Sequence, residues 1–156
     1  MKNVKVLWVI IILLLILSGV LIKKFISGNV APSEDGRTSV ILTKDERNLI
    51  LDEMRTFLVS LQGVSQAITE NNMDKVADLA HKAGMAAEEG TPGSLLQKIP
   101  VGMKKLGFGT RGLFDEIAEN ARTTKDADLA RKQLDALMNN CIACHAIYRL
   151  PEPQEK

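Results

Sequence analysis

The chain opens with its longest apolar stretch. Residues 6–22 contain no charged side chain, and lysines flank them on both sides. A helix needs about 20 apolar residues to cross the hydrocarbon layer of a bilayer, and this stretch approaches that length. Residues 1–26 are therefore predicted to form an N-terminal transmembrane anchor.

A signal peptide is the alternative for the same stretch. A cleavage site would follow the apolar region with a small-x-small pattern. Here Lys23 and Lys24 come first, and the segment 29–31 is only a weak match farther along. A retained anchor, or an uncleaved signal, is therefore favoured. Residues 27–42 are rich in Gly, Pro and Ser without sustained periodicity, and they are predicted to be a linker.

Apolar residues return at helical spacing in residues 43–150, which are predicted to form one domain. Thr43 and Glu46 have the spacing of a capping box and predict the start of a first helix of about seven turns. Asn71 or Asn72 is expected to cap a second helix that continues to the glycines and proline near residue 90. The apolar stripe of the first helix consists of Ile50, Met54, Phe57, Leu58, Leu61, Val64 and Ile68.

Residues 94–109 are the least regular stretch of this domain, because a proline and several glycines interrupt their apolar residues. They are predicted to be an ordered crossing loop with a turn or two of helix. Their apolar side chains would either close a cofactor pocket or cap the other helices. Thr110 is expected to cap a third helix and Asp126 a fourth. The inner face of the fourth helix is expected to hold Ala130, Leu134, Leu137, Met138, Cys141, Cys144, His145 and Tyr148.

These elements predict an all-α fold, an antiparallel four-helix bundle preceded by the anchor. The sequence shows no β-pattern, and residues 151–156 are a polar tail. The formal net charge is +1, which gives no reason to expect nucleic acid as a partner. No phosphate-binding glycine motif and no nucleophile–base arrangement is found, so the sequence does not predict an enzyme.

The segment Cys141-Ile142-Ala143-Cys144-His145 carries the most specific signal in the chain. Two cysteines three positions apart, followed at once by histidine, form the attachment site of a c-type haem. Each cysteine adds to one vinyl group of the haem as a thioether, and His145 becomes the proximal ligand of the iron. Positions three and four apart share one face of a helix, so the haem would lie against that face. One covalently attached haem c is therefore predicted.

Three other uses of the two cysteines fit the sequence less well. A structural zinc site needs four ligands, and His81 is the only other histidine, so that site would use every Cys and His in the chain. A thioredoxin-like pair gains its low thiol pKa at a helix N-terminus, whereas this pair lies near the end of a predicted helix. A structural disulfide is the third alternative.

A four-helix domain with Cys-x-x-Cys-His in its last helix resembles the cytochrome c′ family, class II of the c-type cytochromes. The residues after the motif add to the resemblance. Cys-x-x-Cys-His-x-x-aromatic-Arg is typical of the family, and here the pattern ends in Tyr148 and Arg149. The resemblance covers about residues 43–150 and leaves out the anchor, which many members lack. It implies a haem-containing bundle, and because members often dimerise through their first two helices, it also implies a homodimer.

The family divides by what lies on the iron opposite the proximal histidine. One branch leaves the iron five-coordinate beside an apolar residue of the first helix and binds NO or CO. The other branch is low-spin, places a first-helix methionine on the iron and transfers electrons. Met54, which precedes Arg55, is similar to the methionine of that branch and is the expected sixth ligand, because a thioether favours reduced iron and raises the potential. Ordinary core packing is the alternative for Met54.

Leu58 is the candidate apolar residue beside the iron if the protein belongs to the five-coordinate branch. Arg149 lies one helical turn beyond His145, so its guanidinium is expected to pair with a haem propionate or to polarise the imidazole. A solvated arginine at a helix C-terminus is the alternative. Tyr148 is expected to pack against haem or core. The lesser candidates for the sixth ligand are Met85, His81 and Met103.

The motif and the apolar N-terminus together predict a membrane-anchored electron carrier. In bacteria, c-type haem is attached outside the cytoplasmic membrane, so the haem domain is expected in the periplasm. The charges that flank residues 6–22 are nearly balanced and do not set the orientation themselves. The expected partners are the lipid bilayer and membrane or periplasmic redox proteins.

Overall fold

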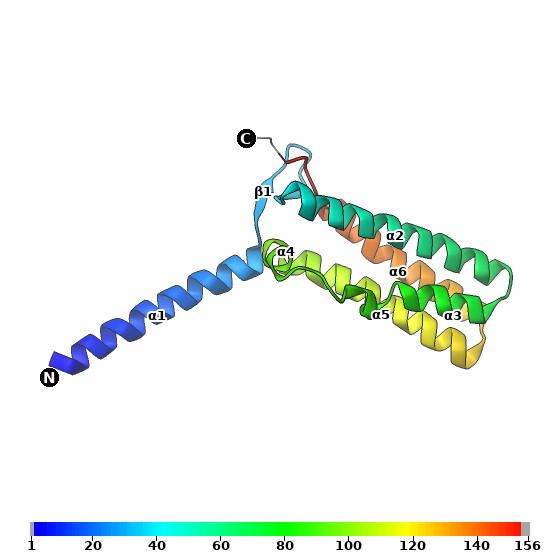
Figure 1. Ribbon diagram of the computed structural model, residues 1–156, viewed down its shortest axis with the longest axis horizontal. Coiled ribbons are helices and arrows are strands. Elements are labelled where there is room, and N and C mark those ends of the chain that lie inside the picture. The colour runs from blue at the N-terminus through cyan, green and yellow to red at the C-terminus, as the bar shows by residue number, and fades with distance from the viewer. Residues whose placement is uncertain (1, 154–156) are drawn as a thin grey trace.

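The computed structural model describes residues 2–153. Its first element is α1 (Lys2–Ser27), which stands apart from the rest of the molecule (Figure 1). Within it, an 18-residue stretch of Val4–Ser27 has a mean hydropathy of 2.9, and no residue of Val4–Ser27 is buried. At a rise of 1.5 Å per residue these residues extend about 36 Å. The helix is therefore long and apolar enough to span a membrane or to act as a signal sequence.

The remainder, residues 28–153, is the packed region, and most of it is helical. Its long helices are α2 (Lys44–Thr69), α5 (Val101–Thr124) and α6 (Ala127–Ile147), together with the shorter α3 (Met73–Lys82). A 3₁₀ turn, η1 (Met85–Glu88), and the short α4 (Gly93–Lys98) lie between α3 and α5. In Figure 1, α2, α3, α5 and α6 lie together with their long axes roughly aligned. The all-α class expected from the sequence is confirmed.

Side-chain caps fix three helix starts where the sequence predicts them. Thr43 Oγ1 accepts from the backbone N–H of Glu46 at 3.3 Å, and Glu46 Oε2 accepts from the N–H of Thr43 at 2.9 Å, which completes the capping box. Asn72 caps α3 and Asp126 caps α6 in the same manner. Each cap satisfies backbone donors that have no partner inside the helix, and so it fixes the residue at which the helix begins.

The end of the predicted second helix and the start of the predicted third both differ from the prediction. The third long helix begins at Val101, not after Thr110, and Thr110 is buried inside it with its hydroxyl donating to the carbonyl of Leu106 at 2.8 Å. The glycines of this stretch count against a helix by propensity, but packing overrides that. A Cβ on Gly102 would collide with the hydroxyl of Tyr148, so the glycine permits a close approach. The second helix ends earlier than expected, at Lys82.

The predicted linker is not a linker, and the expectation of no β-structure is wrong. β1 (Val30–Pro32) and β2 (Thr38–Val40) form an antiparallel hairpin, and β3 (Tyr148–Arg149) pairs with β2 in parallel, with Tyr148 opposite Thr38. Strands of two or three residues are too short for a period-two pattern to stand out. The pairing of β2 with β3 also joins segments that are far apart in the sequence, and local sequence patterns do not reveal such a contact.

The apolar interior has two parts. The larger cluster is shared by α2, α3, α5 and α6 and includes Val64, Val76, Phe114 and Leu137, all fully buried. The smaller cluster lies at the other end, beside the small sheet. Its buried members are Val40, Leu42, Ile50, Leu95 and Ile99. The buried apolar side chains therefore do not form one continuous core along the packed region.

An ordered joint connects α1 to the packed region. The N–H of Gly28 donates to the carbonyl of Lys24 at 3.0 Å and ends the helix. Next, the N–H of Asn29 donates to the carbonyl of Lys98 at 2.7 Å. The Phe25 ring lies against the ammonium of Lys104, 4.0 Å from its centroid. These contacts fix where α1 meets α4 and α5.

Two glycines provide a matched test of this joint. Gly28 and Gly36 both have positive φ, +68° and +81°, so alanine at either position adopts a left-handed conformation that costs about 1 kcal/mol. A Cβ at Gly36 meets nothing, whereas a Cβ at Gly28 would lie 2.6 Å from the nitrogen of Pro100. We expect Gly28→Ala to lower the free energy of unfolding by at least about 1 kcal/mol more than Gly36→Ala. Equal losses in thermal unfolding of the two variants would contradict the joint.

Candidate functional site

The Cys-x-x-Cys-His motif lies at the C-terminal end of α6. Cys141 and Cys144 are half-buried and His145 is exposed. α6 ends two residues after His145, and the N–H of Tyr148 donates to the carbonyl of Cys144 as the chain becomes extended. The expectation that Tyr148 continues the inner face of the helix is therefore wrong, because this residue belongs to β3. The exposed side chain of His145 likewise departs from the expected buried face.

A cavity of about 80 Å³ lies between α2, α4, α5 and α6, next to the motif. Cys144 reaches it from α6 and Met54 from α2. The structure thus brings two of the residues singled out in the sequence to one cavity, although they are far apart along the chain. Met103 of α5, a lesser ligand candidate, also lines it. The apolar lining of the cavity consists of Ile50, Met54, Phe57, Leu96, Ile99, Met103 and Phe108.

Leu58 is not at this cavity. Its side chain is 68% exposed, so the expectation that it belongs to the buried stripe of the first helix is wrong. Met85 and His81 also lie elsewhere. Met85 is 43% exposed on η1, and His81 Nδ1 is 3.6 Å from a carboxylate oxygen of Asp115. Of the two residues of α2 that were candidates for the position beside the iron, Met54 lines the cavity and Leu58 does not.

The small sheet secures the backbone that follows the motif. Arg37 Nη1 donates to the carbonyl of His145 at 3.4 Å, and the same guanidinium binds Asp35 with N–O distances of 2.9 and 2.7 Å. These bonds from Arg37 hold the pKa of the Asp35 carboxyl well below its usual range. Arg149 donates to the hydroxyl of Ser33 at 2.9 Å and is 3.6 Å from Asp35. Arg149 therefore binds the hairpin. Its predicted pairing with a haem propionate would have to compete with the contacts to Ser33 and Asp35.

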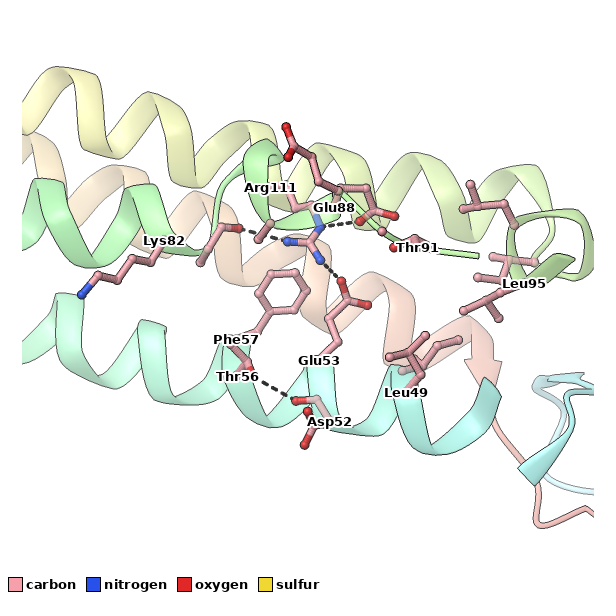
Figure 2. Close-up of a pocket in the computed structure, with 17 residues that line it drawn as sticks. Leu49, Asp52, Glu53, Thr56, Phe57, Lys82, Glu88, Thr91, Leu95 and Arg111 are labelled. Carbon is pink, nitrogen blue, oxygen red and sulfur yellow. Dashed lines mark hydrogen bonds and ion pairs between the residues drawn. The ribbon is translucent and has the colours of Figure 1, made fainter. Parts of the chain in front are cut away.

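A buried ion cluster forms one wall of the cavity. Arg111 of α5 is only 4% exposed, and its guanidinium pairs with Glu53 of α2 and with Glu88 of η1, the latter at 2.7 Å (Figure 2). The guanidinium also lies 4.9 Å from the centroid of the Phe57 ring. A second cavity of about 330 Å³ adjoins this cluster between α2, η1 and α4. Arg111, Glu53 and Glu88 line both cavities, so the ion cluster separates two adjoining spaces.

Lys104 also lines the cavity next to the motif, and its ammonium lies over the Phe25 ring of α1, 4.0 Å from the centroid. Its Nζ is inaccessible to solvent and has no hydrogen-bond partner among the described residues, and burial lowers the pKa of this group. A buried cation without an acceptor is costly, and an anionic group in the cavity would compensate it. The thioether, the thiol and the apolar side chains of this lining have the chemistry that haem requires. The cavity of about 80 Å³ is smaller than a haem ring, however, and His145 and Cys141 do not line it.

The thiols are unsuited to the alternative uses. Burial raises the pKa of both Cys141 and Cys144, so the protonated form dominates at neutral pH. Reactive and metal-binding cysteines need the thiolate, which a lowered pKa supplies. Both cysteines are free, and residues 2–153 contain no group of three Cys, His, Asp or Glu side chains placed to hold a metal ion. These observations weigh against a disulfide, a redox pair and a zinc site.

The charged residues around the cavity are not among the site residues predicted from the sequence. Arg111 lies three positions before Phe114, on the buried face of its helix, and a cation at a core position is the signal that identifies it. The burial of Lys104 could not be recognised from the sequence, because the sequence predicts a loop over residues 94–109. Glu88 and Arg37 had no local signal, since their importance comes from partners far away in the chain.

The ion cluster can be tested by removing its cation. Arg111→Met leaves Glu53 and Glu88 facing each other without a counter-charge, and we expect the free energy of unfolding to fall by about 3–5 kcal/mol. The triple variant Arg111→Met/Glu53→Gln/Glu88→Gln removes all the charges and should recover much of that loss. Denaturant unfolding measures both effects. An Arg111→Met protein as stable as the unmodified one would contradict the role of the cluster.

Comparisons of the chain with family models, with curated proteins and with solved structures give no match. The main elements of the candidate site are Cys144 and Met54 at one cavity, Lys104 in the lining beside them, and a hairpin bonded to the backbone at His145.

Proposed function

We propose that this protein is a membrane-anchored c-type cytochrome that transfers electrons, with α2, α3, α5 and α6 as an antiparallel four-helix bundle of the cytochrome c′ type. The observation that carries the proposal is the cavity that Met54 and Cys144 share, beside a Cys-x-x-Cys-His sequence at the end of α6. Sequence alone separates these residues by almost the whole helical region. Their meeting at one apolar cavity is what a haem held between α2 and α6 requires.

The residues that would hold haem have separate roles. Cys141 and Cys144 would attach it covalently, and His145 and Met54 would be the ligands of the iron. Lys104 would supply positive charge for a propionate, the role that the sequence predicts for Arg149. When bound, the haem iron carries one electron by cycling between its ferric and ferrous states.

The protein contributes low polarity and fixed geometry around this position. The apolar side chains of the lining lower the local dielectric constant. Arg37 holds the backbone of His145, and the hydroxyl of Tyr148 lies against Gly102 of α5, so the end of α6 is attached both to the hairpin and to α5. A rigid surround limits the rearrangement that accompanies electron transfer, which suits a carrier.

We further propose that α1 spans the bacterial cytoplasmic membrane and keeps the packed region in the periplasm. Its length and hydropathy support a span, and the full exposure of its side chains supports an environment other than water. The N-terminus would lie in the cytoplasm. Redox proteins of the membrane or periplasm would be the electron partners.

Absorption spectra of the haem-loaded protein test the iron ligands. We expect a low-spin spectrum that responds little to CO, because Met54 occupies the sixth position. Met54→Ala should become high-spin and bind CO, since the substitution opens that position. Met85→Ala is the matched control, because Met85 is exposed and outside the cavity, and it should leave the spectrum unchanged.

Three other outcomes would contradict parts of this proposal. A high-spin spectrum that shifts strongly with CO in the unmodified protein would favour the five-coordinate, NO- or CO-binding alternative. A Met54→Ala spectrum like that of the unmodified protein would remove Met54 as ligand. A colourless protein from a host that attaches haem to other c-type cytochromes would overturn the haem proposal itself.

A further inference from the structure

Two segments that meet at the joint with α1 carry lysines and no acidic residue. Residues 18–32 contain Lys23 and Lys24 and no acidic residue, and residues 93–109 contain three lysines and no acidic residue. These two segments are distant in the sequence but meet at the joint, where Asn29 bonds to Lys98 and Phe25 contacts Lys104. The fold therefore concentrates positive charge where the apolar helix ends.

Only part of this charge is used inside the protein. Lys98 gives its ammonium to Glu46 at 2.7 Å, and Lys104 is buried. Lys23, Lys24 and Lys105 are exposed, and in the described part of the chain none of them has an ion-pair partner closer than 4.0 Å. They remain available to anionic groups outside the protein.

Exposed apolar side chains accompany these lysines. Ile26, Val30 and Ile41 are 54%, 39% and 40% exposed, and all three adjoin the joint: the N–H of Ile41 donates to the carbonyl of Asn29, next to Val30. We call Lys23, Lys24, Ile26, Val30, Ile41 and Lys105 the joint face. Apolar side chains beside lysines that extend their charged ends are typical of surfaces that lie in the interfacial layer of a bilayer.

The joint leaves little freedom between α1 and this face. Gly28 lies against the backbone of Lys98–Pro100 so closely that a Cβ would not fit. A helix that crosses the membrane therefore delivers the joint face to the headgroup layer directly, without a flexible spacer. The face continues the apolar surface of α1, and its charge complements the phosphates of anionic lipids.

We propose that the joint face binds the lipid surface and holds the packed region in one orientation on the membrane. The inference rests on the membrane span of the proposed function, but not on the presence of haem. Lys104 lines the cavity shared by Met54 and Cys144 and also contacts Phe25 of α1. That cavity therefore lies at the membrane side of the packed region.

Lysine footprinting tests the proposal on the full chain in nanodiscs that contain anionic lipid, one copy per disc. A water-soluble acetylating reagent should modify Lys105 several-fold more slowly after normalisation to Lys132, an exposed lysine near the start of α6. Insertion of a flexible Gly-Ser segment between Gly28 and Asn29 separates the joint face from the membrane and should remove this protection. The same segment inserted between Asp35 and Gly36, in the hairpin turn, leaves the joint intact and should preserve it.

The outcomes separate this inference from the membrane span. If alkaline washing retains the protein in membranes but Lys105 reacts equally fast in the unmodified chain and the joint insertion, the lipid contact is overturned while the span stands. Release of the protein by the wash overturns both. Protection that appears only when several copies share a disc would mean that a second copy, and not lipid, covers the joint face, which also overturns the proposal.

Discussion

The parallel pairing of β2 with β3 is the constraint on which the arrangement of this protein depends. It is only two residue pairs long, yet it joins the segment just after α1 to the segment just after the Cys-x-x-Cys-His motif. Arg37 and Arg149 reinforce the pairing through the shared carboxylate of Asp35 and the carbonyl of His145. As a result, the motif, the hairpin and the end of α1 are held at the same end of the packed region (Figure 1).

The divided core explains why the cavity forms where it does. The larger cluster ends near Phe57 and Phe114, whose rings stack with centroids 5.8 Å apart, and the smaller cluster begins with Ile50. Between them lies the ion cluster of Arg111 with its two carboxylates, which a continuous apolar core would not accept. Buried charge contributes little to stability by itself.

The helices and their caps could be predicted from sequence because the signals are local. Thr43 with Glu46, Asn72 and Asp126 each act within three residues, and each fixed a helix start correctly. The start of α5 could not be predicted, because a glycine at position 102 disfavours a helix by propensity. Only the structure shows that this glycine makes room for the hydroxyl of Tyr148. Of the expected site residues, Met54 and Cys144 both line one cavity. Leu58 and Tyr148 were misplaced, since helical spacing does not show which side of a stripe faces solvent or where α6 ends.

The order of the strands along the chain also has a consequence for folding. β2 precedes all the helices of the packed region, whereas its partner strand β3 follows all of them. Until β3 is synthesised the hairpin has an open edge, and the long loop between the two strands must close before the pairing contributes to stability. We therefore expect the sheet to be completed late, after the helices that lie between its strands have formed.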